Sequence, residues 1–151
     1  MVRKNMKNFM NEYNENGYFI QKNFFGEDFI NSLLKDIESA KKLEDVDVYS
    51  DRSGLLRRLE RLYDKGENLN QLNIKIIEFL KKTFNKSFLI FKDKFNSKPP
   101  GGEGYKAHFD GIFKFFDENN KEKNGWYEYS DIFVNVLVSL DQADDKNGTL
   151  Q

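Results

Sequence analysis

The chain has 151 residues, of which 38% are hydrophobic and 15% aromatic, so it is long enough to bury the core of one domain. Lys and Arg (24) nearly balance Asp and Glu (25), and a net charge of -1 argues against nucleic acid or a membrane surface as a partner. The absence of cysteine excludes disulfides, zinc-thiolate sites and cysteine nucleophiles. No run of about 18 apolar residues occurs, so we expect a soluble cytoplasmic protein with a single domain over residues 1–151.

The first half of the sequence predicts mainly helices. A short strand is expected at 18–20, and a helix at 27–42, where apolar residues recur every three or four positions. The polar segment 45–54 is expected to be a loop. Further helices are predicted at 55–63 and, with a clearer apolar stripe, at 68–84.

The apolar period changes to two in the second half, which predicts strands. We expect strands at 88–95 and 105–110, separated by a loop at 99–102 that contains two prolines and two glycines. The charged segment 117–125 is predicted to be a solvated loop. Residues 131–140 are mostly β-branched or aromatic and form the most strand-like run of the chain.

The end of the sequence carries a hairpin signal. Asn147-Gly148 predicts a tight turn, and Thr149-Leu150-Gln151 would begin a returning strand. So short a strand would leave the edge of the 131–140 strand poorly covered. We therefore interpret the chain as the N-terminal part of a larger β-rich domain.

His108-Phe109-Asp110 is the pattern most suggestive of chemistry. On a strand, residues i and i+2 face the same side, so this triplet would present an imidazole beside a carboxylate. Such a pair supplies two ligands of the 2-His-1-carboxylate triad that binds non-haem Fe(II) with open coordination positions. His108 is the only histidine, so the sequence does not contain the third ligand. A lone His-x-Asp is also compatible with an ordinary hydrogen-bonded pair.

The order and spacing of several segments resemble the phytanoyl-CoA dioxygenase-like group of Fe(II)/2-oxoglutarate-dependent oxygenases. The similarity runs over nearly the full length. Its segments are 14–20 leading into the helix that contains Phe29 to Ile37, then 91–102 followed by Tyr105 and His108-Phe109-Asp110, and finally 138–150.

The resemblance implies an α+β, mainly β, double-stranded β-helix (jelly-roll or cupin-like fold) with N-terminal packing helices, incomplete at its C-terminus. It implies His108 and Asp110 as iron ligands, 2-oxoglutarate and O2 as co-substrates, and hydroxylation of a small-molecule substrate. An aspartate at position 110 favours hydroxylation over halogenation, for which related enzymes carry a small residue there. The family's second ligand histidine and its basic 2-oxoglutarate anchor would follow Gln151, so we expect the 151-residue chain alone to be inactive.

Co-substrate contacts can be assigned to two strand faces. Lys92, Lys94 and Asn96 share one face of the expected 88–95 strand and its end, where they could bind an anionic co-substrate. The alternative is a solvated face of the strand. Asn135 lies on the expected 131–140 strand, where it could donate a hydrogen bond to 2-oxoglutarate. The alternative is that it packs in the core with its polar atoms hydrogen-bonded within the protein.

Two further groups of residues have weaker assignments. Arg57, Arg58 and Arg61 could bind an anionic substrate, although a charged helix face is the preferred interpretation. Trp126 and Tyr127 could belong to a lid over the active site.

Two competing functions remain open at this point. The chain could be a non-catalytic oxygenase-like fragment or interaction module, because one histidine cannot complete a two-histidine triad. It could also bind metal through His108, Asp110 and another carboxylate, although no acidic residue stands at an evident ligand spacing.

Overall fold

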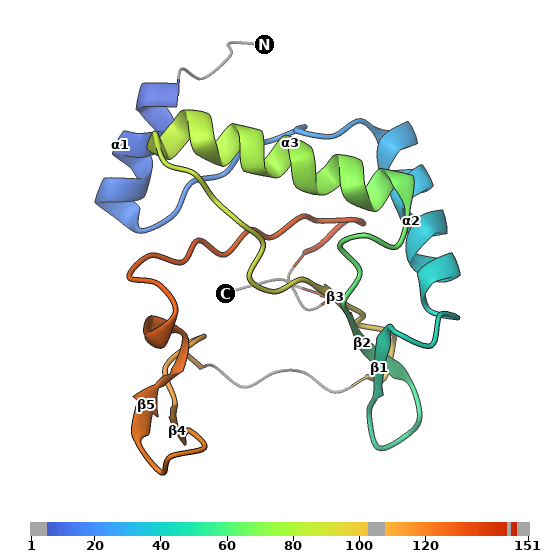
Figure 1. Cartoon of the computed structure of the whole chain (residues 1–151). Coiled ribbons are helices and arrows are strands. Elements are labelled where there is room, and N and C mark those ends of the chain that lie inside the picture. Colours follow the sequence, from blue (N-terminus) through green and yellow to red (C-terminus); the bar gives the residue numbers. More distant parts are fainter. Residues whose placement is uncertain (1–5, 103–107, 145, 148–151) are drawn as a thin grey trace. The chain divides into compact units, whose positions relative to one another are not determined.

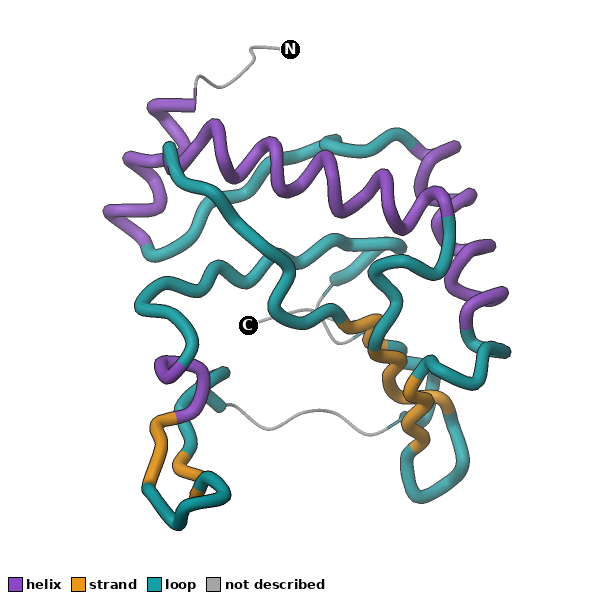
Figure 2. The backbone as a smooth tube through the Cα atoms, in the orientation of Figure 1, coloured by secondary structure: helices purple, strands orange, loops and turns teal. Residues whose placement is uncertain are grey.

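The computed structural model describes residues 6–102, 108–144, 146 and 147 (Figure 1). Contacts divide the chain into two compact units, Met1–Gly102 and Glu103–Gln151. The described residues form three α-helices and two small antiparallel sheets, which confirms the α+β class (Figure 2). They are not mainly β, because the helices contain more residues than the strands. They form no closed barrel. None of their helices is both long enough and apolar enough to cross a membrane.

Three helices belong to the first unit: α1 (Met6–Asn16), α2 (Glu27–Ala40) and α3 (Glu67–Phe84). The last two confirm the helices predicted at 27–42 and 68–84. Helix α1 was not predicted, because its sequence is mostly polar and Phe9 is its one buried residue. Helix α3 packs against both other helices.

The hydrophobic core of the described residues lies in this unit. The Phe9 ring lies 5.0 Å from Phe19 and 5.5 Å from Phe79, measured between centroids, so aromatic contacts join α1 to α3. The expected strand at 18–20 is wrong: these residues extend without a partner strand, and Phe19 packs on the helices instead. The buried apolar residues are Phe9, Leu33, Ile37, Ala40, Val46, Leu59, Leu62, Leu69 and Leu80.

A carboxylate from α2 caps the start of α3. Asp36 Oδ2 accepts hydrogen bonds from the backbone N–H groups of Asn68 (2.7 Å) and Leu69 (3.4 Å). These are donors that a helix cannot satisfy internally, and a negative charge there also suits the helix dipole. The backbone approaches Asp36 so closely at Gly66 that a Cβ would overlap the carboxylate. The cap therefore links the two helices, and it leaves room only for glycine at position 66.

A three-stranded antiparallel sheet completes the first unit, with β2 (Leu56–Glu60) between β1 (Asp47–Ser50) and β3 (Lys94–Asn96). The helix predicted at 55–63 is therefore wrong, and so is the loop predicted at 45–54, which contains β1. Segment 56–60 has apolar residues at helical spacing, but pairing on both sides satisfies its backbone as a strand. The strand predicted at 88–95 forms only where β2 provides a partner, at Lys94–Asn96.

The second unit is built on a small hairpin of β4 (Lys114–Phe116) and β5 (Glu122–Asn124), followed by a 3₁₀ turn, η1 (Gly125–Glu128). The predicted loop at 117–125 is thus partly strand. Its turn is held by Asp117 Oδ1, which accepts hydrogen bonds from the backbone N–H groups of Asn119 (2.9 Å) and Lys121 (3.0 Å). This is the local side-chain bonding that makes aspartate favourable in turns.

Two other predicted strands fail in this unit. Residues 131–140 form no strand, since no ladder partner exists for them within the described residues. Residues 108–110 are not a strand either, and 105–107 of the same prediction lie outside the described residues. Asn147 does close a turn, with its Oδ1 accepting from Asp144 N at 2.8 Å. Gly148 and the expected returning strand lie outside the described residues.

Candidate metal site and the polar face of the first sheet

His108 and Asp110 form a close pair at the surface of the second unit. His108 Nε2 lies 3.4 Å from Asp110 Oδ1, and the two side chains are 59% and 38% exposed. The expected convergence of the two side chains is therefore present. It arises in a turn at Asp110-Gly111, and not on the strand from which it was expected.

Close packing fixes the turn that carries Asp110. Gly111 has φ +77, and a Cβ on it would lie 2.8 Å from Cε3 of Trp126. The Trp126 backbone N–H donates to Gly111 O at 3.2 Å, and a Cβ on Gly125 would overlap that same oxygen. Only glycines allow this approach at both positions. The Trp126 indole therefore packs on Gly111, the residue that follows Asp110.

The 3₁₀ turn that presents Trp126 has its own anchor. Glu128 Oε1 accepts from the backbone N–H of Asn124 at 2.9 Å, and its other oxygen lies 3.1 Å from Lys123 Nζ. The Asn124 hydrogen bond, helped by Lys123, lowers the pKa of Glu128 below the usual glutamate value. This carboxylate therefore joins β5 to η1, the turn that contains Trp126.

The His108 and Asp110 atoms fit two neighbouring positions around a metal ion. Two ligand atoms that each bind an octahedral ion at about 2.1 Å, at a right angle, lie about 3 Å apart. The observed 3.4 Å requires only a small adjustment. Within the described residues no cluster of three or more His, Cys, Asp or Glu side chains could hold a metal.

The other predicted site residues of the first unit lie on one polar face of its sheet. Lys94 is directly opposite Glu60 and Asn96 is opposite Arg58, so all four side chains point to the same side. Lys94 and Asn96 are exposed. Their exposure is compatible with both predicted alternatives, a strand face that binds a ligand and a strand face that contacts solvent. Lys92 precedes β3, and its Nζ lies 3.2 Å from Glu60 Oε2.

Glu60 is the most buried acid of this face. Its side chain is only 9% exposed, and its Oε1 lies 3.0 Å from Arg58 Nε, without the geometry of a hydrogen bond. The Arg58 guanidinium also lies 4.4 Å from the centre of the Tyr49 ring. Removing either cation would destabilise the fold, because a buried charge that is left unpaired is costly.

The three arginines do not lie on a helix face, contrary to the preferred interpretation. Arg57 and Arg58 are in β2, where they point to opposite sides of the sheet. Arg61 follows the strand with φ +65, a backbone conformation that is uncommon outside glycine, and its Nη2 binds Asp47 Oδ1 at 2.8 Å.

The remaining predicted residues are in the second unit. Asn135 is exposed and lies in an extended segment without a partner strand in the described residues. Trp126, assigned to a possible lid, packs on Gly111 and lies 5.5 Å from Phe133 between ring centroids. Tyr127 next to it is 60% exposed.

Sequence reasoning missed the two glycines and the buried acid. Asp110-Gly111 and Asn124-Gly125 are both turn dipeptides, so the sequence contained a signal for the two positive φ angles. No comparable signal marked Glu60, because its burial depends on the pairing of β2 with β3, which lies distant in sequence.

Comparisons of the chain with protein-family models, with curated proteins and with solved structures found no match. The functional assignment therefore rests on the residues and on the geometry described above.

Proposed function

We propose that this chain is part of an Fe(II)/2-oxoglutarate-dependent dioxygenase that hydroxylates a small molecule. The observation that carries the proposal is the convergence of His108 Nε2 and Asp110 Oδ1, 3.4 Å apart and accessible at the surface of their unit. An imidazole and a carboxylate are two of the three protein ligands that leave positions open on Fe(II). The proposed complete fold is a jelly roll, in which the two small sheets would be parts of larger ones.

The chain's own residues would bind and orient. His108 must be neutral and Asp110 ionised to act as ligands, because metal binding requires the deprotonated forms. Gly111 and Trp126 hold the turn behind Asp110, which limits the reorganisation that metal binding would demand. When bound, Fe(II) with 2-oxoglutarate and O2 supplies the oxidising power that these side chains lack.

Co-substrate binding is proposed for the polar sheet face. Lys94 and Asn96 are exposed there and offer an ammonium and an amide, which suit a dicarboxylate such as 2-oxoglutarate. Lys92 is a weaker candidate, since it is already paired with Glu60. Asn135 remains proposed as a hydrogen-bonding residue on the unit that carries the metal pair.

The competing function is a non-catalytic module. It is favoured by the single histidine, which leaves the triad one ligand short within these 151 residues. Under that proposal His108 and Asp110 are an ordinary surface pair, and neither binds metal.

Metal binding to the 151-residue chain gives the first test. Co(II) can stand in for Fe(II) because it accepts the same ligands, binds somewhat more tightly and does not oxidise in air. Added to ¹⁵N-labelled protein, it should broaden amide signals around residues 108–111. Two ligands should give only weak affinity. His108→Ala and Asp110→Asn should each abolish the effect.

The matched control is Glu118→Gln, which removes a charge from an exposed side chain elsewhere in the same unit. It should leave the broadening unchanged. Broadening centred elsewhere, or surviving both ligand substitutions, would rule out the proposed site.

Activity must be measured on the product of the complete gene. With Fe(II) and 2-oxoglutarate it should form succinate, and His108→Ala should abolish that reaction while leaving the far-UV circular dichroism unchanged. Equal succinate formation by both proteins would show that His108 is not an iron ligand. No succinate from either protein would favour the non-catalytic module.

A further inference from the structure

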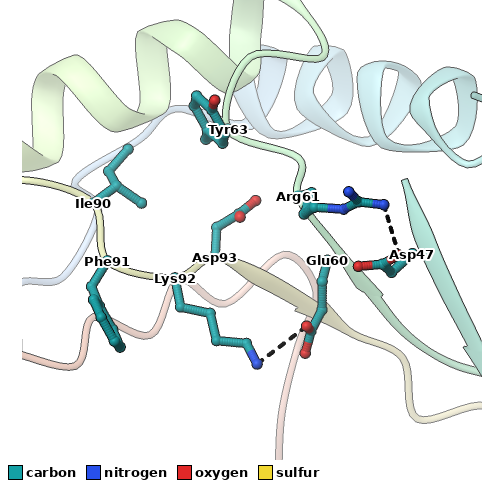
Figure 3. Close-up of a pocket in the computed structure, with 8 residues that line it drawn as sticks. All are labelled: Asp47, Glu60, Arg61, Tyr63, Ile90, Phe91, Lys92 and Asp93. Atoms are coloured by element: carbon teal, nitrogen blue, oxygen red, sulfur yellow. Dashed lines mark hydrogen bonds and ion pairs between the residues drawn. The ribbon is translucent and has the colours of Figure 1, made fainter. Parts of the chain in front are cut away.

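A pocket of about 310 Å³ lies in the first unit, beside the end of β2 (Figure 3). It uses neither His108 nor Asp110, so it is independent of the proposed metal site. Its lining combines three acidic, two basic and three apolar or aromatic side chains. They are Asp47, Glu60, Arg61, Tyr63, Ile90, Phe91, Lys92 and Asp93.

One part of the lining is apolar and open to solvent. Ile90, Phe91 and Tyr63 are 39%, 47% and 49% exposed. Each of these side chains is large, and its burial would stabilise the fold. Segment 88–93 that carries two of them is extended and forms no strand. Exposed aromatic and aliphatic surface inside a concave site is typical of ligand pockets.

Both basic side chains of the lining are already paired with acidic side chains. Arg61 Nη2 binds Asp47 Oδ1 at 2.8 Å, and Lys92 Nζ lies 3.2 Å from Glu60 Oε2 (Figure 3). These pairs leave Asp93 as the acid without an ionic partner among the lining residues. An anionic ligand would have to compete with two carboxylates for its cations, whereas a cationic ligand would not.

Asp93 is held in place with one oxygen still available. Its Oδ2 accepts a hydrogen bond of 2.6 Å from the backbone N–H of Leu62. Its Oδ1 has no hydrogen-bond or ionic partner in the part of the chain that the structure describes. The carboxylate is thus oriented by the backbone, and a half-buried acceptor faces the pocket.

We propose that this pocket binds a small organic cation: an ammonium group carried on an apolar or aromatic body. The ammonium would donate to Asp93 Oδ1, and the apolar body would pack on Ile90, Phe91 and Tyr63. The aromatic faces add attraction for a cation through their quadrupoles. The ligand class follows from the available Asp93 oxygen and the exposed rings together.

Three probes of similar size and different charge test the proposal: phenethylammonium, phenethyl alcohol and phenylacetate. Titrated into the ¹⁵N-labelled 151-residue chain, the ammonium should shift the amide signals of Leu62 and Asp93. Its affinity should exceed that of the alcohol by about ten-fold or more, as a hydrogen bond to a charged group provides. Phenylacetate should bind no better than the alcohol. Equal binding of ammonium and alcohol, preference for phenylacetate, or no binding of the ammonium would overturn the proposal.

Substitution at Asp93 gives the second arm. Asp93→Asn keeps an oxygen for the Leu62 N–H, so the fold should be preserved, and it should weaken phenethylammonium binding by about ten-fold. The control is Glu38→Gln, an equal loss of charge on an exposed position of α2. An unchanged affinity in the folded Asp93→Asn protein would show that this carboxylate does not bind the cation. If that variant does not fold, the three-probe comparison on the unmodified chain still decides.

Discussion

The two units of the chain are held together in different ways. Every buried apolar side chain of the described residues lies in the first unit, where three helices and a three-stranded sheet enclose Leu33, Leu59 and their neighbours. In the second unit, the buried residues among those described are Gly111 and Gly125. Its order comes from hairpin pairing, side-chain hydrogen bonds in turns, and the contact of Trp126 with Gly111.

This difference separates stability from the proposed metal chemistry. Residues with many buried contacts set the global free energy of unfolding, whereas regions with few of them open more readily. His108 and Asp110 belong to the second kind of region. We therefore expect substitutions in the first unit to change global stability, and substitutions around Gly111 to change the geometry of the His108–Asp110 pair.

The largest effect is expected for Leu59→Ala, because Leu59 is fully buried in the central strand. Removing a buried leucine side chain should lower the free energy of unfolding by about 2–5 kcal/mol. Urea unfolding followed by far-UV circular dichroism measures this loss. Leu89→Ala is the control, since Leu89 is 94% exposed, and it should change stability by less than about 0.5 kcal/mol. Similar losses of unfolding free energy in both variants would contradict the placement of Leu59 in the core and Leu89 on the surface.

Gly111→Ala should act on the second unit alone. A methyl group there meets the indole at 2.8 Å, and the positive φ adds strain, together about 1–3 kcal/mol of local stability. Trp126 is the only tryptophan, so its fluorescence reports this change directly. Gly54→Ala has a similar φ of +83 but no atom within 4 Å, and it should leave the fluorescence unchanged. An unaltered emission spectrum in Gly111→Ala would show that the contact is not formed.

The cap between α2 and α3 gives a smaller, third effect. Asp36→Ala leaves the N–H groups of Asn68 and Leu69 without their acceptor and should cost about 1 kcal/mol. Asp36→Asn keeps an acceptor oxygen and should cost less. Glu38→Ala, on the same helix and exposed, is the control and should be nearly neutral. Denaturant midpoints measured on the three variants test that order.

The smallest effect concerns pH. The folded state lowers the pKa of Glu128. The Glu128 carboxylate therefore contributes to folding stability above the usual glutamate pKa, and this contribution is lost as pH falls through the lowered pKa. Carboxyl NMR should show Glu128 titrating below the usual value, with the Asn124 amide signal moving at the same pH. A Glu128 titration at or above the usual value would mean that the Asn124 hydrogen bond is not maintained in solution.

Local periodicity predicted α2 and α3 because their apolar stripes face the core that they themselves form. It failed at Leu56–Glu60, where pairing with β1 and β3 outweighs a helix-like spacing, and at 131–140, where strand-forming residues have no partner among those described. Strands depend on partners distant in sequence, and a single sequence does not name them.

The proximity of His108 and Asp110 was predicted correctly, but its structural setting was not. The i, i+2 spacing of His108 and Asp110 led to the expectation of a shared face, and the two side chains do lie together. Their support is different: a glycine turn backed by Trp126 takes the place of the expected strand. The polar face with Lys94 and Asn96 followed from strand alternation, but the burial of Glu60 between two cations did not.

The most direct test of the metal site uses Trp126 fluorescence during urea unfolding, with and without Co(II). A ligand that binds the folded state raises its apparent stability by mass action. We expect Co(II) to shift the fluorescence midpoint to higher urea and to leave the circular dichroism midpoint, which reports the helices of the first unit, unchanged. His108→Ala should abolish the shift. An equal shift in His108→Ala, or no shift in the unmodified chain at saturating Co(II), would contradict the assignment of His108 and Asp110 as metal ligands.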